Sequence, residues 1–263
     1  MTKIKDSVVW LTGASAGIGE QLAYQLARKG AKLIISARRK NELERVKKNC
    51  NAPTEILPID LEDGFALTQR VKEAERIFGA VDILINNGGI SQRDTILNTS
   101  IEVDRKLMEV NYFGSITLSK MLLPKMVERR KGHHVVITST VGIINTPYRS
   151  GYGASKHALH GFYDALRAEH HEDNIKVSLI LPGFVKTEIS LNALKGDGAA
   201  QREMDIGQAN GMPADKCARL IVKAIENNKN EVYIGGLKEK AGIYLKRFWP
   251  QVAAKAIRKL KVT

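Results

Sequence analysis

The segment that decides the fold is Thr12–Gly19, which reads TGASAGIG. It follows the apolar run Val8–Leu11, and helical periodicity begins directly after it, so it is a glycine-rich turn between a strand and a helix. Gly13 permits a tight turn, Gly17 lets a pyrophosphate approach the backbone, and Gly19 allows close packing of helix and strand. Phosphates would then lie against the helix N-terminus, whose N–H groups attract anions. The spacing GxxxGxG differs from the usual GxGxxG, so a plain tight turn is the alternative interpretation.

Strand-like and helix-like segments alternate along the rest of the chain. Seven short apolar runs have the length of strands: 8–11, 33–36, 55–59, 81–85, 134–139, 177–181 and 231–234. Helical periodicity covers 19–29, 40–49, 64–78, 101–130, 152–171 and 214–227. The runs are continuously apolar, which is typical of parallel strands covered on both faces. We therefore expect one α/β domain over residues 1–263, a Rossmann-like doubly wound parallel sheet of about seven strands flanked by helices.

Composition excludes several classes of protein. A chain of 263 residues with 43% hydrophobic and 26% charged residues is neither disordered nor a coiled coil nor collagen-like. Cys50 and Cys217 form no metal or disulfide pattern, the six histidines lack metal-site spacing, and we expect no metal. No apolar run is long enough for a signal peptide or a membrane span. These features predict a soluble, intracellular (cytoplasmic) protein.

Three cations follow the second predicted strand, at Arg38, Arg39 and Lys40. A site for NAD would place a carboxylate here to bind the ribose 2′-hydroxyl, and none is present. Because arginine pairs well with a 2′-phosphate, the sequence favours NADP(H) as cofactor. The alternative is that these cations only solvate the start of a helix.

Tyr152 is the only tyrosine with a lysine four residues later, Lys156. Residues i and i+4 share one face of a helix, and a nearby ammonium lowers the pKa of a phenol. Ser139 lies at the end of the strand predicted over 134–139, where its hydroxyl would project into the crevice beyond the sheet. We therefore expect Tyr152 to act as a general acid/base, and Ser139 to donate a hydrogen bond to a substrate carbonyl oxygen.

In combination these motifs resemble the short-chain dehydrogenases/reductases over nearly the whole chain. Further matching positions are Asp60-Leu61, Asn86-Asn87-Gly88-Gly89, Asn111 and Pro182-Gly183. Gly88 stands where the family more often has alanine, a small change that leaves the expected roles intact. Residues 152–169 and 182–193 look most like the dehydrogenase/reductase member 7B branch and its bacterial relatives.

The resemblance implies a role for each matching residue. Tyr152 would be the proton donor and acceptor, Lys156 would bind the nicotinamide ribose, Ser139 would position the substrate oxygen, and Asn111 would hold a water in the proton relay. Asp60 would meet the adenine. The cofactor site as a whole would comprise Gly13, Ser15, Gly17, Ile18, Gly19, Arg38, Arg39, Asp60, Leu61, Asn87, Gly88, Gly89, Tyr152, Lys156, Pro182, Gly183, Val185 and Thr187.

The expected function is NADP(H)-dependent hydride transfer that reduces a ketone or oxidises a secondary alcohol of a small molecule. A non-catalytic dinucleotide-binding regulator or scaffold is the alternative. We expect a homodimer or homotetramer.

Two segments lie outside these motifs. The glycine-rich stretch 190–212 predicts a lid over the substrate. The segment 238–263 has eight Lys and Arg and one acidic residue, Glu239, so it carries +7 of the chain's net charge of +13. Its apolar residues recur at helical spacing, with Pro250 as a kink or helix start. This basic amphipathic segment would pack on the pocket or a partner subunit, or lie peripherally on an anionic membrane. No motif for reading nucleic acid accompanies it, and we expect no nucleic-acid partner.

Overall fold

Seven parallel strands form the central sheet of the protein. The computed structural model describes residues 1–258, without the side chain of Lys238. The strands run in the order β3-β2-β1-β4-β5-β6-β9. Their bounds are Val8–Thr12 (β1), Lys32–Ser36 (β2), Thr54–Ile56 (β3), Ile83–Asn86 (β4), Gly132–Ile137 (β5), Ile175–Pro182 (β6) and Glu231–Ile234 (β9). The chain winds outward from β1 in both directions, so the predicted doubly wound fold is confirmed.

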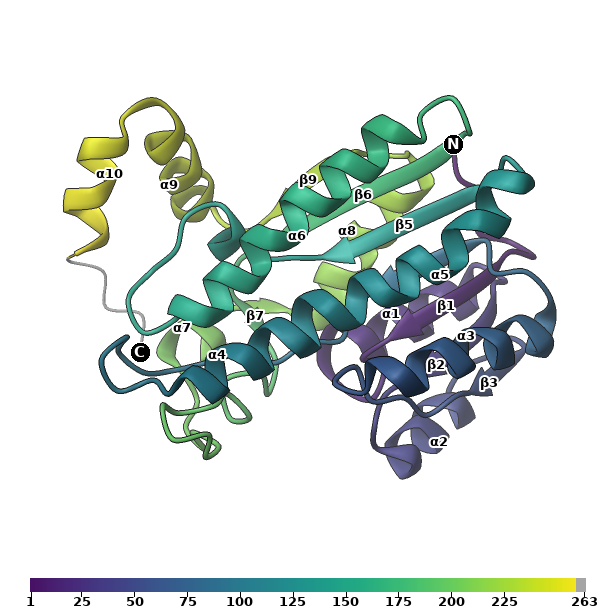
Figure 1. The fold of residues 1–263 in the computed structure, drawn as a ribbon, viewed down its shortest axis with the longest axis horizontal. Helices are drawn as coiled ribbons and strands as arrows, with labels where there is room; N and C mark the ends of the chain where they lie inside the picture. Colours follow the sequence, from purple (N-terminus) through teal and green to yellow (C-terminus); the bar gives the residue numbers. More distant parts are fainter. Residues whose placement is uncertain (259–263) are drawn as a thin grey trace.

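Helices cover both faces of the sheet (Figure 1). One face is covered by Gly17–Arg28 (α1), Lys40–Lys48 (α2) and Ala214–Glu226 (α8). The other is covered by Gly64–Phe78 (α3), Gly114–Glu128 (α5) and Ser150–Glu169 (α6), with Ile101–Met108 (α4) leading into α5. Alternate residues of each strand therefore enter different cores, and this explains why the strands are apolar throughout.

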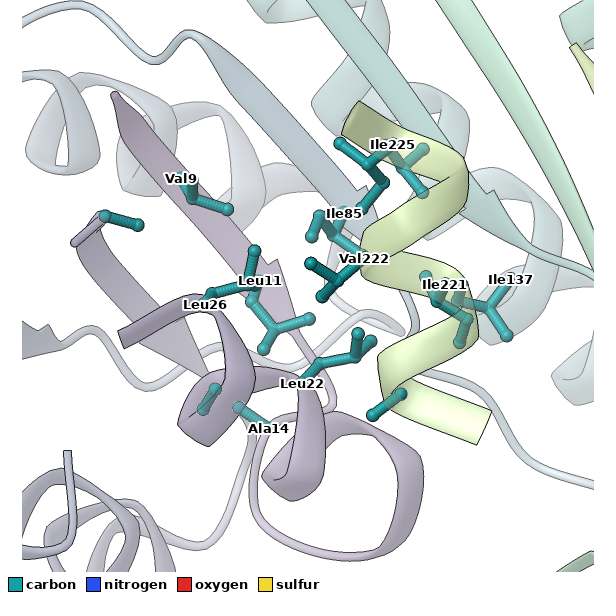
Figure 2. Close-up of a cluster of buried hydrophobic side chains, with 14 of the residues drawn as sticks. Val9, Leu11, Ala14, Leu22, Leu26, Ile85, Ile137, Ile221, Val222 and Ile225 are labelled. Atoms are coloured by element: carbon teal, nitrogen blue, oxygen red, sulfur yellow. The ribbon is translucent and has the colours of Figure 1, made fainter. Parts of the chain in front are cut away.

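The core under α1 and α8 is made of aliphatic side chains. Figure 2 shows Leu22 and Leu26 of α1 and Val222 of α8 near Leu11 of β1, and Ile221 of α8 beside Ile137 of β5. Leu22, Leu26 and Ile221 are completely buried. A leucine-to-alanine change at such a site costs about 2–5 kcal/mol. This packing fixes the start of α1, and with it the glycine turn, against the sheet.

The opposite core contains buried polar groups that are hydrogen-bonded. Trp10 is completely buried, and its Nε1 donates to Ser36 Oγ at 2.8 Å. The Tyr163 hydroxyl lies 2.7 Å from Ser119 Oγ and accepts from Asn86 Nδ2 at 3.0 Å. These bonds satisfy polar atoms that would otherwise be costly to bury, and they tie α5 and α6 to β4.

Two elements differ from the expectation. The third strand ends at Ile56 and not at residue 59, although the N–H groups of Leu57 and Ile59 still donate to the carbonyls of Ile35 and Ala37. The helix expected over 101–130 contains a π-helical segment, Glu109–Phe113, between α4 and α5, and it ends at Glu128. Such a widened turn re-aims side chains and is frequent at functional sites. Here it carries Asn111.

The C-terminal part forms elements outside the sheet layers. Short strands Val185–Lys186 (β7) and Met212–Pro213 (β8) pair with each other, and Ile206–Ala209 (α7) precedes β8. Leu237–Phe248 (α9) and Pro250–Ile257 (α10) follow β9, with Pro250 starting α10 as expected. Positions Lys259, Leu260 and Lys261 of the predicted amphipathic segment lie outside the described residues. Within residues 1–258, no helix is both long and apolar enough to cross a bilayer.

Candidate active site

A cleft with a volume of about 430 Å³ opens at the carboxyl ends of the strands. This is where a doubly wound sheet places its ligands. Its walls come from the turn after β1, the loops after β2, β4, β5 and β6, and the start of α6. Every predicted site residue except Asn111 lines this cleft.

The glycine turn adopts the backbone that only glycine accepts easily. Gly13 and Gly17 have φ of +65° and +57°. A Cβ on Gly19, in the first turn of α1, would lie 2.1 Å from the carbonyl oxygen of Gly13. The glycine-rich loop therefore packs directly against the start of the helix. The turn leaves an open surface at the helix N-terminus, which suits a pyrophosphate.

Thr12 and Asn87 hold this turn in place. The Thr12 hydroxyl accepts from the N–H groups of Asn87 and Gly88, both at 3.0 Å. The Asn87 side chain donates to the carbonyls of Thr12 at 3.0 Å and Gly13 at 3.1 Å. Because its amide is used in this way, Asn87 positions the turn in addition to lining the cleft.

The cations after β2 are exposed at the mouth of the cleft. Arg38 and Arg39 both line it, and Arg39 Nη2 donates to Ser15 Oγ at 3.3 Å. Asp60 is also exposed there, and its carboxylate accepts from the N–H of Glu62 at 3.1 Å. Water reaches all three side chains, so they can exchange hydration for a ligand at low cost.

Ser139, Tyr152 and Lys156 meet on the inner wall of the cleft. Ser139 caps the short turn Thr140–Gly142 just beyond β5, so its hydroxyl projects past the strand as expected. The Lys156 ammonium donates to the carbonyl of Ile137 at 2.9 Å and lies 5.8 Å from the centroid of the Tyr152 ring. The structure thus brings the three predicted side chains together in one cleft, and their catalytic roles stay predictions.

The electrostatics of Tyr152 differ from the expectation. Burial raises the pKa of the Tyr152 phenol above its ordinary value, and the charge of Arg93, a hydrogen bond with Ser139 and the charge of Arg149 oppose that rise. Lys156 is itself buried, which lowers its own pKa to about 8. The prediction that Lys156 lowers the pKa of Tyr152 considered one nearby charge and omitted the cost of burying a phenolate.

Asn111 is buried beneath the cleft and braces the loop after β4. Its Oδ1 accepts from the N–H of Ile90 at 2.8 Å, and its Nδ2 donates to the carbonyl of Ile90 at 3.0 Å and to Ser155 Oγ at 2.9 Å. A Cβ on Gly89 would lie 2.9 Å from Asn111 Oδ1 and 3.6 Å from Lys156 Nζ, so glycine is needed here. The role of Asn111 in holding a water stays a prediction.

A buried ion cluster that the sequence did not reveal lies beside Tyr152. Arg93 donates from Nε to Asp205 Oδ2 at 2.8 Å, and Arg149 donates from Nη2 to the same oxygen at 3.0 Å. Arg93 and Arg149 both line the cleft, and all three side chains are almost fully buried. Arg149 Cζ also lies 5.6 Å from the ring centroid of Phe184. The cluster joins the segment 190–212 to the loop after β4 and the start of α6.

Asp205 is ionised in this cluster. Burial alone would raise the pKa of its carboxyl, but hydrogen bonds from Arg93 and Gln201, with the charges of Arg93 and Arg149, hold it below the ordinary value. Burial and the charge of Arg93 lower the pKa of Arg149, against the pull of Asp205. The Asp205 carboxylate therefore fixes the direction of both guanidinium groups next to the phenol.

The loop after β6 closes the remaining side of the cleft. The N–H of Gly183 donates to the carbonyl of Ile234 at 2.8 Å, which fastens the loop to the edge strand β9. The N–H of Val185 donates to Gln208 Oε1 at 3.2 Å. A Cβ on Gly17 would lie 3.0 Å from Thr187 Cγ2, so this loop reaches the glycine turn across the cleft.

Comparison with known proteins identifies the family. A family model described as short chain dehydrogenase matches residues 7–197. Over 257 residues the chain is 45% identical to a dehydrogenase/reductase SDR family protein 7-like of Anopheles gambiae, covering 95% of this chain and 81% of that protein. The chain belongs to the short-chain dehydrogenase/reductase family.

Other relatives in this family agree with the predicted branch. Human dehydrogenase/reductase SDR family member 7 is 42% identical, with 94% of this chain and 76% of that protein covered. Mouse member 7B is 39% identical, with 94% and 79% covered. A short-chain dehydrogenase/reductase from Burkholderia phymatum, solved in complex with NAD, has the same fold with a TM-score of 0.84 at 22% identity, over 96% of each chain.

These findings confirm a short-chain dehydrogenase/reductase of the member 7 and 7B branch. The chain is thus an oxidoreductase of a family that binds a nicotinamide dinucleotide. Within residues 1–258, no three or more His, Cys, Asp or Glu side chains gather in a way that could hold a metal ion.

Proposed function

We propose that this short-chain dehydrogenase/reductase interconverts a ketone and a secondary alcohol with NADP(H), using Ser139, Tyr152 and Lys156. The observation that carries the proposal is the meeting of these three side chains in one cleft with the glycine turn. The cleft fits a dinucleotide because Gly13 and Gly17 have left-handed backbone and Gly89 leaves room beside Lys156.

The residues divide the chemistry among them. A nicotinamide bound in the cleft would supply the hydride for reduction of the carbonyl carbon, or would accept one from the alcohol carbon. In reduction, the Tyr152 hydroxyl gives its proton to the carbonyl oxygen as the C=O bond becomes CH–OH, and the phenolate left behind regains a proton from solvent. Ser139 donates a hydrogen bond to the same oxygen and stabilises its developing negative charge.

Arg93 and Arg149 support Tyr152 in this step. Their positive charges lower the cost of forming a phenolate that burial would otherwise oppose. Asp205 keeps both guanidinium groups in position, so the phenolate forms in a field that is already organised. Lys156 would bind the hydroxyls of the nicotinamide ribose.

The proposed preference for NADP(H) rests on the mouth of the cleft. Exposed Arg38 and Arg39 follow β2, where a carboxylate for the ribose 2′-hydroxyl would stand in an NAD enzyme. A 2′-phosphate can take charge-assisted hydrogen bonds from guanidinium groups that water already surrounds. Arg39 is partly oriented by Ser15.

The test measures NADPH oxidation over a panel of ketones, 3-oxoacyl esters, steroids and quinones. Tyr152→Phe should lower kcat/KM on any accepted carbonyl by about 10²–10⁴-fold and leave NADPH binding intact. Tyr24→Phe is the matched control, because the Tyr24 hydroxyl donates to Glu20 on α1, away from the cleft, and should leave turnover unchanged. If the protein binds NADPH, oxidises none of it across the panel and is unaffected by Tyr152→Phe, a non-catalytic dinucleotide-binding role would replace this proposal.

A further inference from the structure

One face of α9 is apolar and turned away from the protein. Leu237, Ala241, Tyr244 and Phe248 are spaced four, three and four residues apart, so they form one stripe along the helix. Ala241 is exposed, and Leu237, Tyr244 and Phe248 are 86%, 56% and 64% exposed. A helix that packs on a water-soluble body normally buries this stripe.

The opposite face of α9, which packs on the body, contains polar residues. The Lys246 ammonium donates to the carbonyl of Ile143. A Cβ on Gly183, in the wall of the cleft, would lie 3.2 Å from a carboxylate oxygen of Glu239. Ile243 is the buried apolar residue between them. Glu239 and Lys246 therefore contact the body together with Ile243, whereas the apolar stripe of α9 faces outward.

The following turn extends the apolar stripe. Trp249 is 60% exposed, its ring lies edge-on to Phe248 at 6.0 Å between centroids, and Val252 is 52% exposed. Figure 1 shows α9 and α10, in yellow, projecting beyond the helices that cover the sheet. The stripe and this corner together form one exposed surface, here called the α9–α10 surface: Leu237, Ala241, Tyr244, Phe248, Trp249 and Val252.

The two helices that carry the α9–α10 surface also carry exposed cations. Between residues 237 and 258 the sequence has six Lys and Arg, and Glu239, its single acidic residue, faces the body. Lys240, Arg247, Lys255 and Arg258 are exposed. Aromatic and aliphatic side chains flanked by cations match the interface of an anionic bilayer, where rings enter the headgroup region and cations meet lipid phosphates.

We propose that the α9–α10 surface binds the protein peripherally to an anionic lipid bilayer. A second copy of the chain is a poor occupant, because apposing two such surfaces would bring their cations together. Both parts of the surface should contribute, since apolar burial and attraction to anionic lipid act together in interfacial binding.

The test is co-sedimentation of the full-length protein with vesicles of phosphatidylcholine alone or with one quarter phosphatidylglycerol. At 0.1 M NaCl, partitioning should be at least tenfold stronger on the anionic vesicles, and 0.5 M NaCl should weaken it at least tenfold. Lys240→Glu with Arg247→Glu, and separately Phe248→Ser with Trp249→Ser, should each lower partitioning at least tenfold.

Matched changes elsewhere on the surface serve as controls. Lys48→Glu with Lys223→Glu reverses two exposed cations on other helices, and Phe65→Ser removes an aromatic ring that is 83% exposed on α3. Neither should change partitioning. Binding that is absent, that ignores salt and lipid charge, or that falls equally in controls and test variants would overturn the proposal. So would a loss of self-association, without lipid binding, in the α9–α10 variants.

Discussion

Two pairs of arginines face the same cleft in different ways. Arg38 and Arg39 are adjacent in the sequence and exposed at the mouth of the cleft. Arg93 and Arg149 are far apart in the sequence, buried beside Tyr152, and both bound to Asp205. The exposed pair stays hydrated until an anion arrives, whereas the buried pair is fixed by a carboxylate of the protein itself. The buried cations are thus held rigid by an ion pair, whereas the exposed cations are accessible to an anionic ligand.

The largest effect should come from breaking the buried pair. Asp205→Asn removes the carboxylate that both guanidinium groups bind, and it should lower the free energy of unfolding by about 3–5 kcal/mol in urea titrations. Asp197→Asn is the control, because Asp197 is exposed in the same segment, and it should cost less than about 1 kcal/mol. A similarly small loss for Asp205→Asn would mean that the cluster holds without its carboxylate.

Lys156 extends the comparison of buried and exposed cations, because it is a buried cation whose charge depends on pH. Burial lowers its pKa from 10.5 to about 8, so between these values the unfolded chain binds more protons and stability rises with pH. Below pH 8 the buried charge costs on the order of 3 kcal/mol. Lys156→Met should therefore be more stable than the parent by about 2–3 kcal/mol at pH 7, and urea unfolding should show this gap closing toward pH 10.5.

The pH dependence distinguishes this explanation from a packing effect. A gap between Lys156→Met and the parent that stayed constant from pH 7 to pH 10.5 would reflect the fit of the methionine and not the lost charge. Lys48→Met, at an exposed position on α2, should leave stability nearly unchanged at both ends of the range.

The smallest effect concerns the exposed pair. Arg38→Ala should lower the ratio of kcat/KM with NADPH to that with NADH by about 10- to 100-fold, as expected for one charge-assisted hydrogen bond, with no change in unfolding. Arg28→Ala, an exposed change at the end of α1, should leave the ratio unchanged. Equal efficiency with both cofactors in the unchanged protein would contradict the NADP(H) preference.

The features that sequence predicts well are local ones. The turn at Thr12–Gly19 is specified by glycines whose backbone no other residue adopts easily, and Tyr152 and Lys156 lie one helical turn apart whatever surrounds them. The seven apolar runs became the seven strands of the sheet, and the central strands β1, β4 and β5 are buried throughout.

The features that sequence missed depend on contacts between distant segments. Asp205 lies in a glycine-rich stretch without periodicity, and only the fold brings it to Arg93 and Arg149. Arg149 did offer a signal, since it lies one turn before Tyr152 at the start of the same helix. The predicted shift of the Tyr152 pKa had the wrong direction. Burial, which depends on the whole fold, raises this pKa more than neighbouring charges lower it.

The positions of the two tryptophans give the protein an optical property of practical use. Trp10 is completely buried in β1 and bonded to Ser36, whereas Trp249 is exposed between α9 and α10. Since indole emission moves to longer wavelengths in water and to shorter ones in apolar surroundings, loss of the core shifts Trp10 to the red. A ligand that covers the α9–α10 surface shifts Trp249 to the blue. Trp249→Phe leaves Trp10 as the single tryptophan, which reports the integrity of the sheet, and subtracting its spectrum from that of the parent isolates the emission of Trp249.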